Sequence, residues 1–155
     1  MNLFSRQNDN DLLKYLDSTE YLLVSNISKI FALETLGEIA LDLDNRLYVL
    51  EKGKLQFYTF NNRNQKIIVD DCNENEIVWE TAFFTRNIAA QKSCLSLCIQ
   101  LKIEVLSKSV ILAYDRKELE QIFSQFPLIH LKIQAAINDS LCEKHIRITQ
   151  KLVRE

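Results

Sequence analysis

Apolar residues recur at every second position through a long central part of the chain. Two of the clearest runs are Leu47 with Val49, and Leu55 with Phe57 and Thr59. A period of two places alternate side chains on opposite faces of a strand. The runs follow one another at intervals of roughly 8–12 residues, which is typical of a compact antiparallel sandwich or barrel. The pattern predicts strands from about residue 30 to residue 114.

Turns between these runs are expected to consist mainly of Asn and Asp. The chain has only two glycines and one proline, whereas Asn and Asp tolerate turn conformations through local side-chain hydrogen bonds. We expect turns at residues 42–46, 52–54 and 61–64.

Helical patterns occupy both ends of the chain. The polar residues 8–11 can cap a helix that runs to Leu16, and a second short helix is expected over residues 18–28. After residue 114, Asp115 resembles an N-cap with Glu118 as the capping-box acid of a helix that ends near residue 125.

A longer helix is expected from Pro127 to about residue 150, because proline is tolerated in a first helical turn. The order of elements predicts an α+β fold: an antiparallel β-roll or jelly roll of about eight strands, with short N-terminal helices and a C-terminal helix pair. We expect residues 1–155 to form one domain, with a helical entry over residues 1–29, the β-roll over 30–114 and the helices over 115–152.

Composition argues against several classes of function. The net charge is −2 and no long run of Lys and Arg appears, so nucleic acid is not expected as a partner. No signal peptide or membrane-spanning stretch is expected either, which predicts a cytoplasmic location.

No metal, cofactor or catalytic centre is expected. Cys94 and Cys98 would lie about 13 Å apart on one strand face at ~3.3 Å per residue, too far to share a metal ion. His130 and His145 are separated by about four helical turns and cannot meet on one helix. We therefore expect reduced structural cysteines and no enzyme activity.

Two segments resemble the cyclic-nucleotide-binding domain family. Residues 46–58, RLYVLEKGKLQFY, are similar to that family's strand–turn–strand motif, in which Gly53 would be the turn glycine. Residues 107–119, SKSVILAYDRKEL, followed by Phe126 and Pro127, resemble its last strand and the next helix. The resemblance covers roughly residues 11–150 and implies a β-roll that works as a regulatory module.

The family's function depends on a phosphate-binding cassette, approximately F-G-E-[LI]-A-L followed by an arginine and a small residue. The corresponding stretch here is IVWETAFF, residues 77–84, in which Glu80 keeps the position of the acid. Trp79 replaces the glycine, and Ala89 stands where the arginine is usual. Backbone N–H groups and the guanidinium hold the phosphate in this family, so both losses predict that cyclic nucleotide is not bound.

Alternatives for this segment remain open. A three-residue insertion would put Lys92 in the arginine's place, and Arg86 is close by, so a sensor for cyclic nucleotide or another small anion is the second hypothesis. Trp79 either fills the pocket or offers a stacking surface, and Glu80 is either a ribose-binding acid, as the resemblance implies, or a helix-start acid. The candidate ligand-binding residues are Trp79, Glu80, Thr81, Arg86, Lys92 and Ser93.

The long C-terminal helix carries an apolar stripe that must be buried. It can fold back on its own β-roll or pair with a second copy, as in dimeric members of the family, and we favour the homodimer. A protein partner, or a place in a larger protein such as a transporter, is also expected for a regulatory module. The expected dimer interface is Ile133, Ile137, Leu141 and Ile148.

Overall fold

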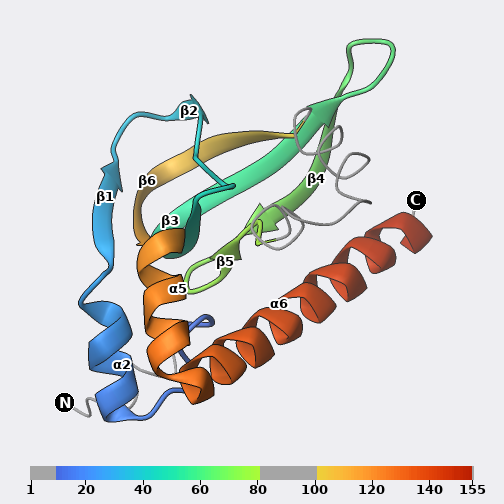
Figure 1. Ribbon diagram of the computed structural model, residues 1–155. Coiled ribbons are helices and arrows are strands. Elements are labelled where there is room, and N and C mark those ends of the chain that lie inside the picture. The colour runs from blue at the N-terminus through green and yellow to red at the C-terminus, as the bar shows by residue number, and fades with distance from the viewer. Residues whose placement is uncertain (1–9, 81–100, 155) are drawn as a thin grey trace, which may run out of the picture.

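The strands form a single antiparallel sheet in the computed structural model, which describes residues 10–80 and 101–154 (Figure 1). The strand order is β1-β6-β3-β4, with β2 paired to β6 and β5 paired to β3. Helices precede and follow the strands, so the predicted α+β class is confirmed. The strands are β1 Lys29–Leu33, β2 Gly37–Ile39, β3 Arg46–Phe60, β4 Lys66–Cys72, β5 Ile77–Val78 and β6 Lys102–Asp115.

β3 unites two runs that were expected to be separate strands, so the turn prediction at residues 52–54 is wrong. The pairing of β3 with β6 shifts register between Leu50 and Leu55, which makes this stretch an irregularity within one long strand. Gly53 has φ +100° here, and a Cβ on it would lie 2.1 Å from Ser109 Oγ. Glycine is therefore required by a bulge and a close approach, not by a hairpin turn.

β6 joins the end of the apolar run over residues 95–106 and the whole run over residues 110–114 into one strand of 14 residues. The described residues form six strands, and residues 95–100 of the expected series lie outside the described residues. The β-region begins at Lys29 and ends at Asp115, within a residue of its predicted limits.

Within residues 10–28, one of the two expected helices is formed. α2, Ser18–Ser25, is capped by Asp17, which accepts a hydrogen bond from the Glu20 N–H at 2.8 Å while Glu20 bonds back to the Asp17 N–H. The helix expected just before it forms a series of turns instead. Asn10 Oδ1 accepts from the N–H groups of Leu12 and Leu13, and such a side-chain acceptor competes with helical hydrogen bonding.

Two helices follow β6 and meet at an elbow (Figure 1). α5, Arg116–Gln125, begins at the predicted N-cap Asp115, whose carboxylate accepts from the Lys117 N–H. α6, Pro127–Arg154, starts directly after Phe126 and runs for 28 residues along one side of the sheet. None of the described helices has an apolar stretch long enough to cross a membrane.

Alternation along β3 divides the core in two. Leu47 and Val49 belong to a cluster shared with the helices, which also contains Ile133 and Ile137 of α6. Their neighbours Tyr48 and Leu50 belong to a second cluster inside the strand layer. One apolar face of β3 therefore packs against α6. The helix lies next to the short strand β5.

Candidate functional site

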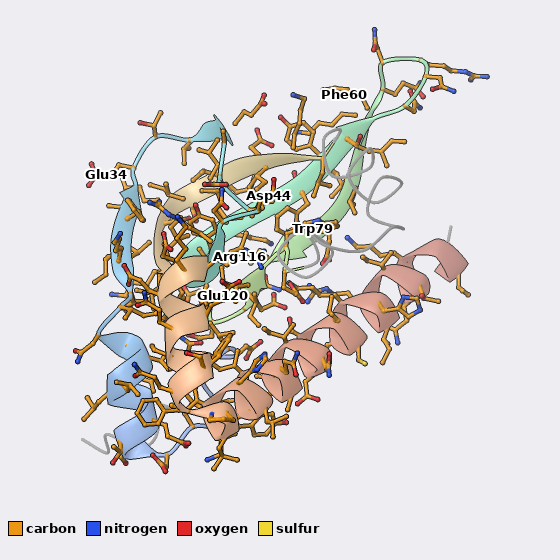
Figure 2. All side chains as sticks on the ribbon, in the orientation of Figure 1. Glu34, Asp44, Phe60, Trp79, Arg116 and Glu120 are labelled. Carbon is orange, nitrogen blue, oxygen red and sulfur yellow. The ribbon has the colours of Figure 1, made fainter. Side chains whose placement is uncertain are left out.

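The candidate site lies where β5 leaves the sheet. Val78 of β5 pairs with Tyr48 of β3, and Trp79 and Glu80 follow directly. Trp79, labelled in Figure 2, lines a cavity together with residues of α6. The pairing of β5 with β3 thus places Trp79 and Glu80 beside the C-terminal helix α6.

Trp79 adopts a backbone conformation that favours glycine. Its φ is +47°, in the left-handed region, where a residue with a Cβ is strained by roughly 1–2 kcal/mol. The indole is half-buried and packs on Phe57, with ring centroids 5.0 Å apart and planes tilted by 51°. This aromatic contact offsets the strain and keeps the indole next to the strand-layer core.

Glu80 forms a buried ion pair with α6. Lys144 Nζ donates to Glu80 Oε2 at 2.6 Å, and the two side chains are 8% and 1% exposed. Lys144 also donates to the carbonyl of Ile77, so the helix is tied to the end of β5 twice. The carboxylate is therefore neutralised by the chain itself and shielded from solvent.

Two polar atoms beside this ion pair are buried without a partner among the described residues: Glu80 Oε1 and Trp79 Nε1. A buried polar group left unpaired costs about 1–3 kcal/mol. Neither atom is accessible to solvent.

Arg147 makes a second attachment one helical turn further along α6. Its Nη2 and Nε donate to the two oxygens of Asp70 at 2.7 and 2.9 Å, and its Nη1 donates to Glu76 at 3.0 Å. The hydrogen bonds with Asp70 raise the pKa of the guanidinium above its ordinary value, and Glu76 adds to that shift. The paired fork is the strong form of an arginine–carboxylate contact.

A cavity of about 560 Å³ lies next to the Lys144–Glu80 pair. Most of its lining is apolar, which does not suit a phosphate. The lining residues are Trp79, Glu80, Leu141, Cys142, Lys144, His145, Ile146 and Ile148.

The other four candidate ligand-binding residues, Thr81, Arg86, Lys92 and Ser93, lie outside the described residues. Lys144, which the sequence analysis did not single out, does carry a sequence signal. It stands three residues after Leu141 and four before Ile148, on the stripe that faces inward. A lysine at such a position requires a buried anionic partner.

The cysteines and acids within residues 10–80 and 101–154 provide no metal centre. In those ranges no three Cys, His, Asp or Glu side chains gather in a way that could hold an ion. Cys72 is buried, and burial raises the pKa of its thiol to about 12, whereas Cys142 is exposed on α6.

Two residues of the predicted dimer interface are buried within their own domain. Ile133 and Ile137 are each 1% exposed and belong to the core cluster of their own domain, with Leu141 packed against it. The apolar stripe of α6 packs on its own domain, because the N-terminal turns, β3 and α5 supply the apolar surface that covers it. Ile148 is half-buried beside the cavity.

Comparison with solved structures identifies the architecture. A cyclic nucleotide-binding domain from Methylobacillus flagellatus matches with a TM-score of 0.76 at 9% identity, over 97% of this chain and 83% of that one. The catabolite activator protein of Thermus thermophilus matches with a TM-score of 0.66 at 15% identity. The chain has the fold of a cyclic-nucleotide-binding domain.

Other solved structures match over most of this chain at similarly low identity. The N-terminal domain of a transcriptional regulator from Streptomyces coelicolor matches at 15% identity over 92% of this chain and 94% of its own. The match to the Thermus activator covers 91% of this chain but 62% of the activator. No protein-family model and no curated protein matches the sequence.

Within a cyclic-nucleotide-binding fold, the left-handed φ of Trp79 acquires a specific meaning. The sequence resemblance places a glycine at this position, and the φ of +47° at Trp79 is a conformation in which glycine is unstrained. Trp79 therefore carries a side chain at a turn that a glycine would form without strain.

Proposed function

We propose that this domain is a non-catalytic regulatory or interaction module whose nucleotide-type pocket no longer binds cyclic nucleotide. The observation that carries the proposal is the buried ion pair between Glu80 and Lys144. In the family that the sequence resembles, the acid at this position accepts a hydrogen bond from a ribose hydroxyl. Here the carboxylate is already paired and is 1% exposed.

The energy needed to break the Glu80–Lys144 ion pair would make any nucleotide binding weak. Breaking a buried ion pair by removing one partner costs about 3–5 kcal/mol. A ligand that had to displace Lys144 from Glu80 would lose that much affinity, roughly a hundredfold to several thousandfold. A micromolar ligand would thus become a millimolar one.

The other contacts of α6 also support a pocket that is closed to nucleotide. Arg147 holds the next turn of the helix on Asp70 and Glu76, so exposing Glu80 requires both attachments to open. Trp79 adds bulk where close approach of a phosphate to the backbone needs glycine. The proposed closed pocket therefore depends on Lys144 and Arg147 of α6 and on Trp79, which follows β5.

For the partner, we propose a second copy that docks on the outward face of α6. This face is uncharged over several turns, and three of its residues, Leu131, Ile146 and Val153, are 63%, 56% and 81% exposed. Ala135 and Cys142 lie on the same face and are also exposed. A two-fold helix pair would cover the patch symmetrically, whereas a transporter context rests on the sequence resemblance alone.

Thermal melting with cyclic AMP or cyclic GMP tests the loss of nucleotide binding. A Kd of ~1 mM or weaker stabilises the fold by at most ~0.4 kcal/mol at 1 mM nucleotide. For a domain of this size that is a shift on the order of 1 °C. A micromolar Kd would give ~4 kcal/mol and a shift of about 10 °C, and that result would refute the proposal.

A further inference from the structure

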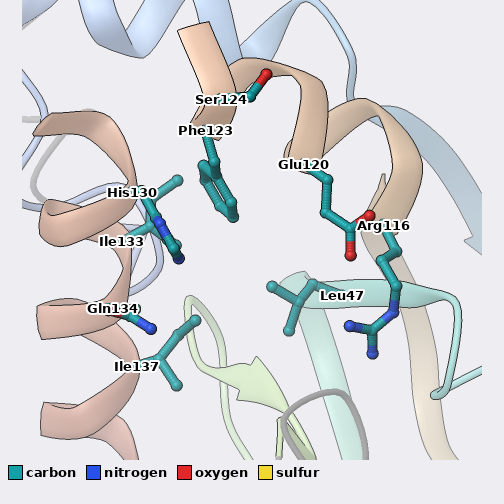
Figure 3. A pocket seen from close by; sticks show the side chains of 9 residues that line it. All are labelled: Leu47, Arg116, Glu120, Phe123, Ser124, His130, Ile133, Gln134 and Ile137. Atoms are coloured by element: carbon teal, nitrogen blue, oxygen red, sulfur yellow. The ribbon is translucent and has the colours of Figure 1, made fainter. Parts of the chain in front are cut away.

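A second cavity, of about 410 Å³, opens in the angle between α5 and α6 (Figure 3). Phe126 is the C-cap of α5 and donates its N–H to the Ile122 carbonyl. α6 begins at Pro127 and runs in a different direction from α5. The helices therefore diverge from the elbow and leave space between them. None of the residues that line this cavity lines the one beside Trp79.

The volume suits a small organic molecule. Small-molecule sites commonly measure ~300–1,000 Å³. A cavity of ~150 Å³ already accommodates benzene. The elbow cavity thus has room for one ring and its substituents.

The inner lining of the elbow cavity is apolar and flat. Leu47, Ile133 and Ile137 form its base, and each is 1% exposed. The imidazole of His130 stacks on the ring of Phe123, with centroids 4.4 Å apart and planes 11° from parallel. A stacked pair with an apolar base favours an aromatic ring over a flexible or charged chain.

The mouth of the cavity carries both signs of charge. Arg116 and Glu120 lie one turn apart on α5, and Figure 3 shows them on the side of the cavity opposite His130. Arg116 Nε donates to the Asp44 carbonyl at 2.8 Å, which helps to fix the side chain. Gln134 of α6 adds an amide that can both donate and accept.

We propose that the elbow cavity binds a small uncharged molecule with one aromatic ring and a group, such as a carboxamide, that both donates and accepts hydrogen bonds. The ring would lie against the Phe123–His130 stack and over the apolar base. The polar group would face Arg116 and Glu120, where an anion would meet a carboxylate and a cation a guanidinium. This site is separate from the closed pocket at Glu80, so either proposal can fail without the other.

The two histidines of the chain give a direct readout. His130 lines the elbow cavity, while His145 lies about four turns further along α6 and reports on the separate cavity beside Trp79. The Cε1–H signals of both are followed by NMR while benzamide, benzoate or benzylammonium is added to about 50 mM, and a His145→Gln variant assigns them.

Benzamide should shift the His130 signal saturably, with a Kd on the order of 1–10 mM for so small a ligand, and leave His145 unchanged. Benzoate and benzylammonium should bind at least about fivefold more weakly, because benzoate would face the like charge of Glu120 and benzylammonium that of Arg116. A His130 signal that none of the three moves, or tighter binding of either ion, would overturn the proposal.

A filling variant tests the position of the ligand. Gln134→Phe should place a ring in the cavity and weaken benzamide binding at least about tenfold. Gln121→Phe is the matched control, since Gln121 is an exposed residue of the neighbouring helix that does not line the cavity. Unchanged binding in Gln134→Phe, with His145 at its wild-type position to show an intact fold, would also overturn the proposal.

Discussion

Trp79 combines a strained backbone with a buried contact, and the two effects can be separated by mutation. Replacing it by alanine removes the packing on Phe57 but keeps the strain of a Cβ at φ +47°. Replacing it by glycine removes both. We expect both variants to be less stable than the wild type, with Trp79→Gly about 1 kcal/mol more stable than Trp79→Ala.

Urea unfolding of the two variants checks this difference. Equal stabilities, or a more stable alanine variant, would mean that the left-handed turn is not held in solution.

The Lys144–Glu80 pair should behave as a buried ion pair does. Lys144→Met alone should lower the free energy of unfolding by about 3–5 kcal/mol, because it leaves a buried carboxylate unpaired. The double variant Lys144→Met with Glu80→Leu should recover most of that loss, since an apolar pair needs no compensation. Denaturant unfolding of both variants measures the two values.

An exposed ion pair provides the control. Lys66 and Glu104 lie 2.8 Å apart with 40% and 28% of their side chains exposed, and a Lys66→Met change should cost no more than ~1 kcal/mol. If Lys144→Met were as mild as Lys66→Met, Glu80 would be solvated and the closed pocket would not exist.

At the scale of elements, the two glycines test the irregularity in β3. Gly53 has φ +100° and would place a Cβ 2.7 Å from the Lys108 carbonyl, whereas Gly37 has φ +115° and open space around it. Gly37→Ala therefore adds strain alone, about 1–2 kcal/mol, and Gly53→Ala adds that strain and a backbone clash.

We expect Gly53→Ala to be less stable than Gly37→Ala by at least ~1 kcal/mol in thermal or urea unfolding. Equal costs would indicate that β3 and β6 can separate at the bulge without penalty.

The elements themselves follow from local patterns. Period-two alternation located β3 and β6, and the Asp115 cap located the start of α5. The pattern could not distinguish a bulge from a turn at residues 52–54, because glycine and lysine suit both. That distinction depends on Ser109, which contacts Gly53 from 56 residues away along the chain.

The site was less predictable than the fold for a similar reason. Trp79 and Glu80 were found from their register in a motif, but their partners Phe57 and Lys144 come from distant elements. The apolar stripe of α6 was recognised, yet periodicity alone does not say whether its own domain or a second copy covers it. Ile133 and Ile137 are covered by their own domain, because they pack in the core cluster that contains Leu47.

At the scale of the whole molecule, the outward face of α6 should control self-association. Leu131 and Ile146 are exposed on this face, so changing both to Lys would place like charges against each other in a two-fold pair without disturbing the core. We expect a dimer for the wild type and a monomer for the double variant when both are sedimented at ~100 μM.

Gln121→Lys together with Gln125→Lys is the control, because it adds the same charge to exposed positions on α5. A wild type that sediments as a monomer at this concentration ends the homodimer proposal.

The closed pocket at Glu80 is tested most directly by calorimetric titration of the domain with cyclic AMP and with cyclic GMP. Because Lys144 already neutralises and covers the acid, nucleotide added to about 1 mM should give no saturable heat, which corresponds to a Kd of ~1 mM or weaker. Saturable binding of either nucleotide at one site per chain, with a Kd below ~10 μM, would show that the pocket at Glu80 is open to nucleotide.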